Sequence, residues 1–455
     1  MSDSGSTPST EITSSAAAHP TRRTMLKGVA AGAGLAVVPA TLLAACSSDK
    51  KATGGSSGAS GGATAGGGSI GFGSNYSDPT TKAAFAALTA SATGATKTKI
   101  KVNTTDHNTF QNNISNYLQG TPDDLATWFA GYRMQFFAAQ NLLTPLDDVW
   151  DKIGTNFNDA TKNLSKGVDG KYYFVPLYNY PWVVFYNKSV FNSKGYAVPK
   201  SWDQFLALGT QMKKDGLIPL AFADKDGWPA LGTFDIINMR VNGYDYHIKL
   251  MKHEVPWTDK GVKDVFDHWA QLLPHCQKGA TGRVWQDAAK ALENKQAGMM
   301  FQGSNQVAAN YAAANLADLD FFPFPEINSE FGTDFMDAPT DGFMLPKKAK
   351  NQAAAKAVLE YIGTPQAEAT FLKSDKWDIG VAQGLVAPTY NDIQKKAVTE
   401  IGKCKNVAQF MDRDTVPDMA TAMIKLIQQF IDNPSSGTIS SIQRSAEAQA
   451  KTIFQ

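Results

Sequence analysis

Short apolar runs alternate with amphipathic runs from Ser69 to the C-terminus of the chain. A brief apolar run at 70–72 is followed at 80–90 by a segment that predicts a helix. Residues 99–103 alternate polar and apolar side chains with period two, which predicts a half-buried strand. The next run predicts a helix, because its apolar residues share one helical face: Phe110, Ile114, Tyr117 and Leu118. This alternation predicts α/β layers with a largely parallel sheet.

The clearest local pattern begins at Ser201, which is placed to cap a helix N-terminus. Gln204, three residues later, can reach back and complete a capping box. Gly216 is suited to end the same helix in a left-handed conformation. We therefore predict a helix from residue 202 to residue 215, with Phe205, Leu208 and Met212 on its buried face.

The first residues predict an export signal. Arg22 and Arg23 precede an apolar, small-residue stretch from residue 28 to residue 45, the layout of a twin-arginine signal peptide. Glycines and Pro39 interrupt this stretch, and a permanent membrane helix needs about 20 predominantly apolar residues. A signal-anchor helix with an accidental cysteine is the alternative reading.

Residues 43–46, Leu-Ala-Ala-Cys, resemble the lipobox of bacterial lipoproteins. We therefore expect cleavage after residue 45, a lipid on Cys46, and a flexible Gly/Ser tether over residues 46–68. The folded protein would then be exported and held on the outer face of the cytoplasmic membrane, in the cell envelope. In that compartment disulfides can persist, but spacing alone leaves open whether Cys276 and Cys404 are bonded.

Composition excludes some classes of partner. The 43 Lys and Arg residues nearly balance the 42 Asp and Glu residues, so the chain lacks the broad positive field that binds nucleic acid. The six histidines are scattered, and the sequence carries no His/Cys cluster with metal-ligand spacing. We expect no metal and no cofactor. The 455 residues suffice for two or three hydrophobic cores.

Three ordered motifs carry a family resemblance. Residues 170–177, Gly-Lys-Tyr-Tyr-Phe-Val-Pro-Leu, are followed by Val-Phe-Tyr-Asn-Lys-Ser-Val-Phe at 184–191 and by Val-Pro-Lys-Ser-Trp-Asp-Gln-Phe at 198–205. Residues 296–304, 322–325 and 341–345 continue the pattern in order. From residue 69 to the C-terminus the chain resembles family 1 extracellular solute-binding proteins, the maltose-binding-protein-like group. The segment 410–418 resembles a subset of actinobacterial carbohydrate binders.

This resemblance implies an α/β, two-lobe periplasmic-binding-protein-like fold of type II, the Venus-flytrap type, with a hinge between the lobes. Residues 69–178 with 342–388 would form lobe 1, and residues 179–341 with 389–455 would form lobe 2. The chain would cross between them near 176–181, 339–342 and 387–390. Hinge closure around a ligand is the motion such a fold implies.

The ligand implied by the resemblance is a sugar or short oligosaccharide. A sugar offers hydroxyl groups to polar side chains and apolar C–H faces to aromatic rings. Both kinds of side chain stand at strand ends and crossings, although for any single aromatic residue core packing is the competing explanation. Asp341 also departs from the Gly-Gly-aromatic return common among relatives, and a turn residue is its alternative role. The residues that we expect to contact the ligand are Asn75, Phe129, Tyr132, Tyr180, Trp182, Trp228, Gln302, Asn305, Asp341, Trp377, Asp412 and Arg413. We expect Trp150, Trp202 and Trp269 to serve packing instead.

Three functional classes compete. A glycoside hydrolase would use two carboxylates about 5–10 Å apart, which a sequence cannot measure. A scaffold protein would show repeats or many short strands, and the sequence has neither. The sequence also lacks a nucleophile elbow, a His-Glu-x-x-His motif and a P-loop. We therefore predict a monomeric transport receptor, not an enzyme, whose partners are a carbohydrate ligand and the two transmembrane permease subunits of an ABC importer with a separate ATPase.

Overall fold

The computed structural model describes residues 68–384 and 390–455. The predicted signal peptide of residues 1–45, the lipidation site Cys46 and the tether up to residue 67 lie outside the described residues. So do residues 387–389 of the third predicted crossing. Within the described ranges, no helix combines the length and apolar character needed to cross a membrane.

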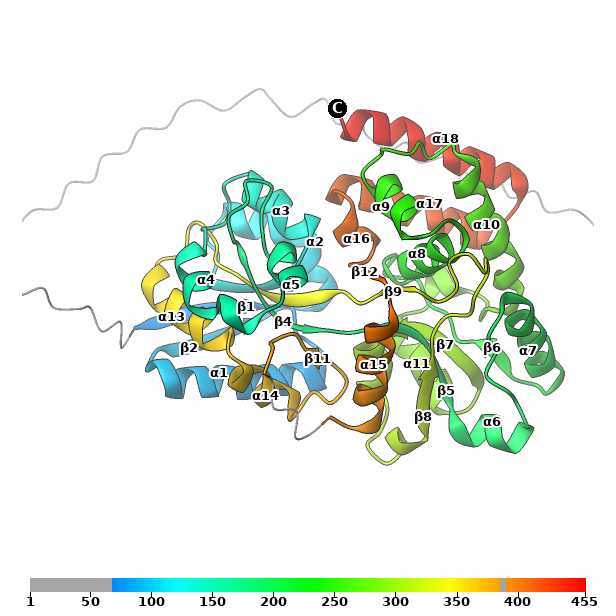
Figure 1. Ribbon diagram of the computed structural model, residues 1–455, viewed down its shortest axis with the longest axis horizontal. Helices are drawn as coiled ribbons and strands as arrows, with labels where there is room; N and C mark the ends of the chain where they lie inside the picture. Colours follow the sequence, from blue (N-terminus) through cyan, green and yellow to red (C-terminus); the bar gives the residue numbers. More distant parts are fainter. Residues whose placement is uncertain (1–67, 385–389) are drawn as a thin grey trace, which may run out of the picture. The chain divides into compact units, whose positions relative to one another are not determined.

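A six-stranded sheet forms the centre of the first lobe (Figure 1). Helices α1, α13 and α14 cover one face of this sheet, and α2 and α3 pack on the other. The strand order is β11-β4-β10-β3-β1-β2. The strands are β1 Ser69–Ser74, β2 Lys99–Thr104, β3 Leu125–Phe129, β4 Phe174–Asn179, β10 Thr340–Met344 and β11 Ile379–Gly380. The helices are α1 Pro79–Thr96, α2 His107–Gln119, α3 Tyr132–Ala139, α4 Asp147–Ile153, α5 Asp159–Leu164, α13 Gln352–Ile362 and α14 Pro365–Leu372.

The second lobe is built on a four-stranded sheet of order β6-β7-β5-β8, with a two-stranded ladder of β9 and β12 beside it. Its strands are β5 Trp182–Asn187, β6 Ile218–Leu220, β7 Ala297–Gly303, β8 Leu319–Phe322, β9 Phe335–Asp337 and β12 Asn406–Ala408. Its helices are α6 Lys188–Lys194, α7 Trp202–Lys214, α8 Pro229–Asn242, α9 Tyr244–Met251, α10 Lys260–Leu272, α11 Trp285–Glu293, α12 Ser304–Ala308, α15 Asp392–Lys403, α16 Met411–Asp414, α17 Pro417–Asp432 and α18 Ser436–Ile453. Short 3-10 helices lie at Gly154–Asn156, Leu273–His275, Ala280–Gly282 and Leu316–Asp318.

The sheets are mixed, so the expectation of a largely parallel sheet was too simple. Strand β1 runs parallel to β2 and β3, but β10 runs antiparallel to both β3 and β4. In the second lobe β5 is antiparallel to β7 and β8. Strand β10 returns to the first lobe after the chain has passed through the second lobe, and no helix connects it to the strands beside it. The rule that strands joined by a helical crossover run parallel therefore does not apply to β10.

Two of the predicted crossings fall where the chain changes sheet. Between β4 and β5, residues 180 and 181 join the six-stranded sheet to the four-stranded one, and between β9 and β10, residues 338 and 339 lead back. The exact division of the remaining residues between the two lobes stays a prediction.

Local patterns placed several elements correctly. Ser201 caps α7 by accepting a hydrogen bond from the Gln204 backbone N–H, and Gly216 follows the helix with a φ of 80°. The Gln204 side chain, however, accepts from the Lys200 backbone N–H at 2.8 Å, one residue before the position that a capping box requires.

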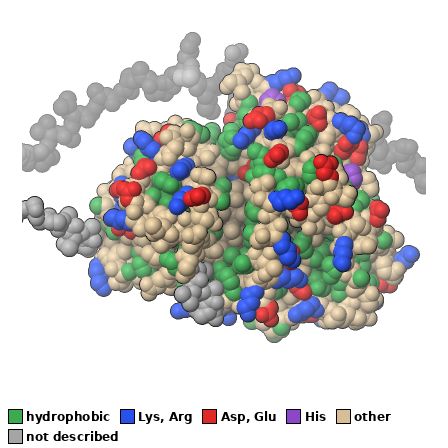
Figure 2. Space-filling model, viewed as in Figure 1, with side chains coloured by type: hydrophobic (Ala, Val, Ile, Leu, Met, Phe, Trp, Pro, Cys, Tyr) green, Lys and Arg blue, Asp and Glu red, His purple; other side chains and the backbone are tan. Residues whose placement is uncertain are grey.

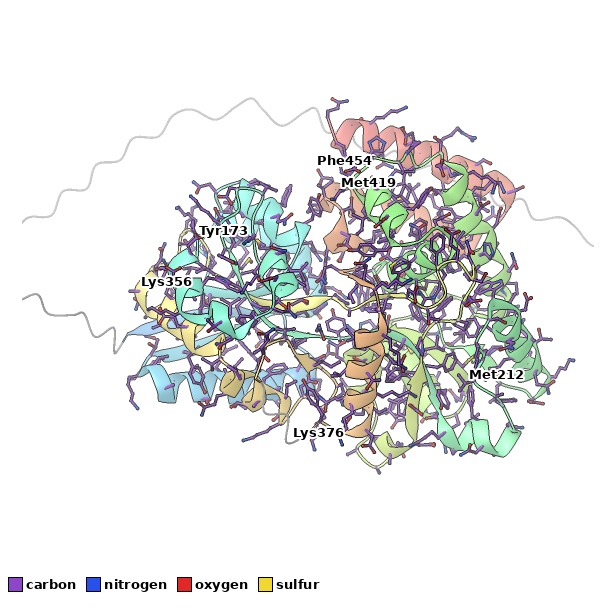
Figure 3. The ribbon with its side chains drawn as sticks, in the orientation of Figure 1. Tyr173, Met212, Lys356, Lys376, Met419 and Phe454 are labelled. Atoms are coloured by element: carbon purple, nitrogen blue, oxygen red, sulfur yellow. The ribbon has the colours of Figure 1, made fainter. Side chains whose placement is uncertain are left out.

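Side chains fill the layers between sheets and helices in both lobes (Figure 3). Trp150, Trp202 and Trp269 are buried in this packing, as predicted. On the face seen in Figure 2, Lys and Arg side chains are interspersed with Asp and Glu, as the near-zero net charge leads one to expect.

Cys276 and Cys404 are free thiols. Each sulfur contacts a carbonyl oxygen in the preceding turn of its own chain segment, Leu272 for Cys276 and Glu400 for Cys404. The disulfide left open by the sequence is therefore not formed.

The crowded backbone at Gly342 gives a testable prediction. A Cβ atom there would lie 2.2 Å from the Val175 carbonyl oxygen and 2.8 Å from Pro176 Cα, and neither is the end of a flexible side chain. We expect Gly342→Ala to lower the free energy of unfolding by about 2–4 kcal/mol, measured by urea denaturation.

The matched control is Gly94→Ala. Gly94 lies in α1, and a Cβ added to it would meet no atom within 4 Å. This change should raise stability slightly, by up to about 1 kcal/mol, since alanine favours helices over glycine. Equal effects of the two substitutions would show that β4 and β10 tolerate separation.

Candidate functional site

A cavity opens where elements of both lobes meet at the crossings. It holds about 730 Å³ of empty space, which includes the part that is open to solvent. The first lobe supplies residues from α1, α2, β3, β4 and β10, and the second supplies residues from β5, α11, α12 and α16 and the residue directly before α8. The lining residues are Asn75, Tyr76, Asp78, Thr81, His107, Gln111, Phe129, Tyr178, Tyr180, Trp182, Trp228, Trp285, Asn305, Gln306, Ala309, Pro339, Asp341, Phe410, Asp412 and Arg413.

Three tryptophans form an aromatic wall on the second lobe. Trp228 stands edge-on to both Trp182 and Trp285, with ring centroids 6.3 Å apart in each pair. Local sequence fixes Trp228: Gly227 adopts a φ of 80°, and Pro229 begins α8 directly after it. These rings offer the flat apolar surface that a C–H face of a ligand can contact.

Arg413 occupies the floor of the cavity. Its Nη1 donates to Asp341 Oδ1 at 2.7 Å, its Nη2 donates to the Tyr180 hydroxyl at 2.9 Å, and its guanidinium lies 4.2 Å from the Phe129 ring centroid. The Tyr178 hydroxyl donates to the other oxygen of Asp341 at 3.2 Å. Burial raises the pKa of Asp341, and the neighbouring Arg413 guanidinium offsets part of that rise. Arg413 is thus held by β10, the first crossing and β3 together.

A second ion pair borders the cavity at Asp412. Arg133 Nη1 donates to Asp412 Oδ2 at 2.8 Å and to Gln111 Oε1 at 2.6 Å. The Arg133 guanidinium also lies 4.8 Å from the Trp128 ring centroid and 5.0 Å from that of Phe129. The pair joins α3 of the first lobe to α16 of the second.

His107, at the start of α2, also lines the cavity and is uncharged at pH 7. Burial, together with the positive charges of Arg413 and Arg133, lowers the pKa of His107 to about 4. Its two ring nitrogens contact side-chain amides, Nδ1 that of Asn75 at 3.4 Å and Nε2 that of Gln111 at 2.6 Å. Asn75 is itself fixed by Thr127, whose hydroxyl donates to Asn75 Oδ1 at 2.7 Å.

Several buried polar atoms on the lining residues have no hydrogen-bond partner among the described residues. A buried polar atom without a partner costs roughly 1–3 kcal/mol, so such atoms are uncommon in ordinary cores. Here they include donors and acceptors. They are Tyr76 Oη, Trp182 Nε1, Trp228 Nε1, Asn305 Oδ1, Gln306 Oε1, Asp412 Oδ1 and Arg413 Nε.

The charges of the cavity leave no excess of positive charge. Arg413 is paired with Asp341, Arg133 with Asp412, and His107 is neutral at pH 7. Asp78 adds a carboxyl group whose pKa is raised by burial. The cavity therefore disfavours an anionic ligand and suits an uncharged one.

Nine of the twelve residues predicted to contact a ligand line this cavity: Asn75, Phe129, Tyr180, Trp182, Trp228, Asn305, Asp341, Asp412 and Arg413. Tyr132, Gln302 and Trp377 do not border it. Gln302 pairs across the ladder with Val183, whose side chain packs in the second-lobe core, whereas Trp182 pairs with Gly303. Trp377 is buried in that core, and its carbonyl oxygen accepts a hydrogen bond from the Ser304 hydroxyl.

Sequence reasoning missed several lining residues, among them His107, Gln111 and Trp285. His107 follows the carboxyl end of β2, the position where parallel strands present ligand loops, so that rule could have found it. Trp285 begins α11, and no local motif marks it. Its position beside Trp228 is set by the tertiary packing of segments far apart in the sequence.

The buried His107 should make the protein sensitive to acid. Its pKa is about 4 in the folded chain against an ordinary value of 6.5, so the unfolded state binds the proton more readily as pH falls below 6.5. This residue alone should reduce the free energy of unfolding by about 2 kcal/mol between pH 7.5 and pH 5. Denaturant titrations of wild type and His107→Gln at both pH values measure the effect. An unchanged pH dependence in the variant would contradict a neutral, buried His107.

Comparisons with known proteins agree with this geometry. The model of the bacterial extracellular solute-binding protein family matches residues 76–369. The crystal structure of the bacterial solute receptor AcbH, described as having an exclusive preference for β-D-galactopyranose, is 76% identical, with a TM-score of 0.85 over 86% of this chain and 100% of that one.

More distant relatives align over part of their length. An uncharacterized ABC transporter extracellular-binding protein of Pyrococcus horikoshii is 28% identical over 62% of this chain and 64% of its own. The α-glucosides-binding periplasmic protein AglE of Rhizobium meliloti is 26% identical over 56% of this chain and 59% of its own. The chain thus spans about three fifths of these relatives.

The resemblance seen in the sequence and the two-lobe fold are both confirmed. With a family match over most of its folded part, the chain belongs to the bacterial extracellular solute-binding proteins.

Proposed function

We propose that this protein is the substrate-binding component of an ABC importer and that it captures an uncharged sugar in the cavity between its lobes. The observation that carries the proposal is the set of buried donors and acceptors without partners beside the tryptophan wall. Each hydroxyl group of a sugar can both donate and accept, and its ring presents C–H faces. No single charge or apolar tail would match this mixture of donors and acceptors.

The sugar we propose is D-galactose in its pyranose form. The support is the 76% identity to AcbH, together with that receptor's stated preference for β-D-galactopyranose. The paired charges of the cavity also fit a neutral monosaccharide and disfavour sugar phosphates or uronic acids.

The proposed contacts divide by chemistry. Trp228, Trp182 and Trp285 contact the apolar ring face. Asn305, Gln306 and Asp412 accept hydrogen bonds from hydroxyl groups through side-chain oxygens that have no hydrogen-bond partner among the described residues. The indole N–H groups of Trp182 and Trp228 and Arg413 Nε donate. Tyr132, Gln302 and Trp377 are left out of this proposed set, since they do not border the cavity.

In the proposed mechanism, the ligand binds to one lobe, adds contacts from the other and shifts the population toward the closed form. The hinge comprises the crossings at residues 180–181 and 338–339. A monomer that carries a lipid at Cys46 and is tethered to the outer face of the cytoplasmic membrane then presents the closed form to two permease subunits, while a separate ATPase supplies the energy.

The family consists of binding proteins, which argues against the hydrolase alternative. Incubation with p-nitrophenyl galactosides and with unlabelled galactobiose distinguishes the two. A receptor for D-galactose leaves both compounds unaltered and retains added D-galactose stoichiometrically, whereas released nitrophenol or monosaccharide would identify an enzyme.

The tryptophan wall provides the mutational test. Trp228 is partly exposed, unlike Trp182, which is 2% exposed and packs against Phe410. Trp228→Ala should therefore weaken binding of D-galactose by about 10- to 100-fold with little loss of folding. Isothermal titration calorimetry gives the affinity, and thermal denaturation shows whether the variant is folded.

The matched control is Trp202→Phe, since Trp202 packs beside Phe205 and Phe324 in the second lobe, away from the cavity. This variant should lose some stability and keep its affinity. If Trp228→Ala binds D-galactose with unchanged affinity, the tryptophan wall does not contact the sugar.

A further inference from the structure

A second hollow adjoins the sugar cavity. It holds about 1,290 Å³ of empty space including open solvent, and it lies between α2 and α3 of the first lobe and the start of α17 in the second. Gln111, Trp228 and Asp412 line both hollows. The two spaces therefore share a wall.

Arg133 binds two of the residues that separate the two hollows. Two of the three shared residues, Gln111 and Asp412, bind the same nitrogen of Arg133, at 2.6 Å and 2.8 Å. The guanidinium lies near the rings of Trp128 and Phe129, and both partners of the ion pair are only 14% exposed. Because Arg133 is contacted on several sides, its side chain has little conformational freedom. Arg133, Gln111 and Asp412 therefore form a rigid separation between the two hollows.

The second hollow has the chemistry of a sugar site. Trp128 is 1% exposed, lines the hollow, and its indole N–H has no partner among the described residues. Trp228 also lines the hollow, together with amide side chains such as those of Asn108 and Asn112 and the charged side chains of Lys225, Asp226 and Asp418.

We propose that Arg133 is a specificity-determining residue, which restricts the ligand to one sugar ring by closing the cavity off from a hollow that would otherwise take a second ring. The inference rests on the proposed function and concerns only chain length. To reach the second hollow, a disaccharide whose first ring occupies the cavity would have to place its second ring at the position of the Arg133–Asp412 pair. Removing the arginine side chain joins the two hollows and removes that obstruction.

The test compares wild type with Arg133→Ala by isothermal titration calorimetry, using D-galactose, β-1,4-galactobiose and β-1,6-galactobiose. Galactobioses carry galactose at both ends, so either end can enter the cavity. Wild type should prefer galactose over either galactobiose by at least a hundredfold. Arg133→Ala should gain at least tenfold in affinity for one galactobiose, even if its affinity for galactose falls because Asp412 has lost its partner.

Arg283→Ala is the matched control. Arg283 donates to the carbonyl oxygens of Phe222 and Lys278 and borders neither hollow. It should show the selectivity of wild type. If Arg133→Ala does not fold, Arg133→Gln takes its place, since glutamine is shorter and still carries a donor for Asp412.

The outcomes separate the two proposals. If wild type binds none of the three sugars, the assignment of a galactose receptor fails, and this inference fails with it. If wild type prefers galactose but the folded Arg133 variants gain no affinity for a galactobiose, the receptor assignment stands and Arg133 is not the barrier. Equal binding of mono- and disaccharide by wild type would also overturn the inference.

Discussion

The site depends on the contacts that the buried guanidinium of Arg413 makes with its neighbours. Removing a charge from water costs several kcal/mol, and only close, well-oriented partners offset that cost. Asp341, the Tyr180 hydroxyl and the Phe129 ring supply them. These partners come from β10, the first crossing and β3, while Arg413 itself comes from α16. One side chain thereby links α16 of the second lobe to the first crossing and to the two central strands of the first-lobe sheet.

Several features of the cavity follow from this arrangement. The positive charge of Arg413 contributes to keeping His107 neutral, and its pairing with Asp341 leaves no free charge for an anionic ligand to bind. Helix α16 also carries Asp412 to the cavity beside Arg413. Asp412 Oδ2 accepts a hydrogen bond from Arg133, and Oδ1 lies 3.7 Å from Arg413 Nε without a hydrogen-bond partner among the described residues. Fixed donors and acceptors in a site shielded from water discriminate strongly among hydroxyl patterns, because a mismatched ligand leaves them unsatisfied.

The fold was largely predictable because its signals are local or carried by ordered motifs. The cap at Ser201, the alternation over residues 99–103 and the motifs between residues 170 and 205 each specify a structure within a few residues. The mixed strand directions were not predictable from the alternation alone, since β10 pairs with strands more than 150 residues earlier in the chain.

The site was predictable where a residue stands at a strand end or crossing, as Asn75, Tyr180 and Trp228 do. It was less predictable within strands and helices, where adjacent residues point in different directions and only one of them faces the cavity. On β7, Gln302 is paired with Val183, whose side chain packs in the core, whereas Trp182, which lines the cavity, is paired with the next residue, Gly303. On α3 the cavity wall is held by Arg133 and not by Tyr132, because adjacent helix positions point about 100° apart. Such choices depend on register and helix phase in the assembled fold.

The most direct measurement is a crystal structure of the protein grown with D-galactose. The account predicts one pyranose ring against Trp228, with hydroxyl oxygens about 2.6–3.2 Å from Asn305 Oδ1 and Asp412 Oδ1 and from at least one tryptophan indole nitrogen. A sugar bound elsewhere, or a ring in the cavity that leaves these buried atoms without partners, would contradict it.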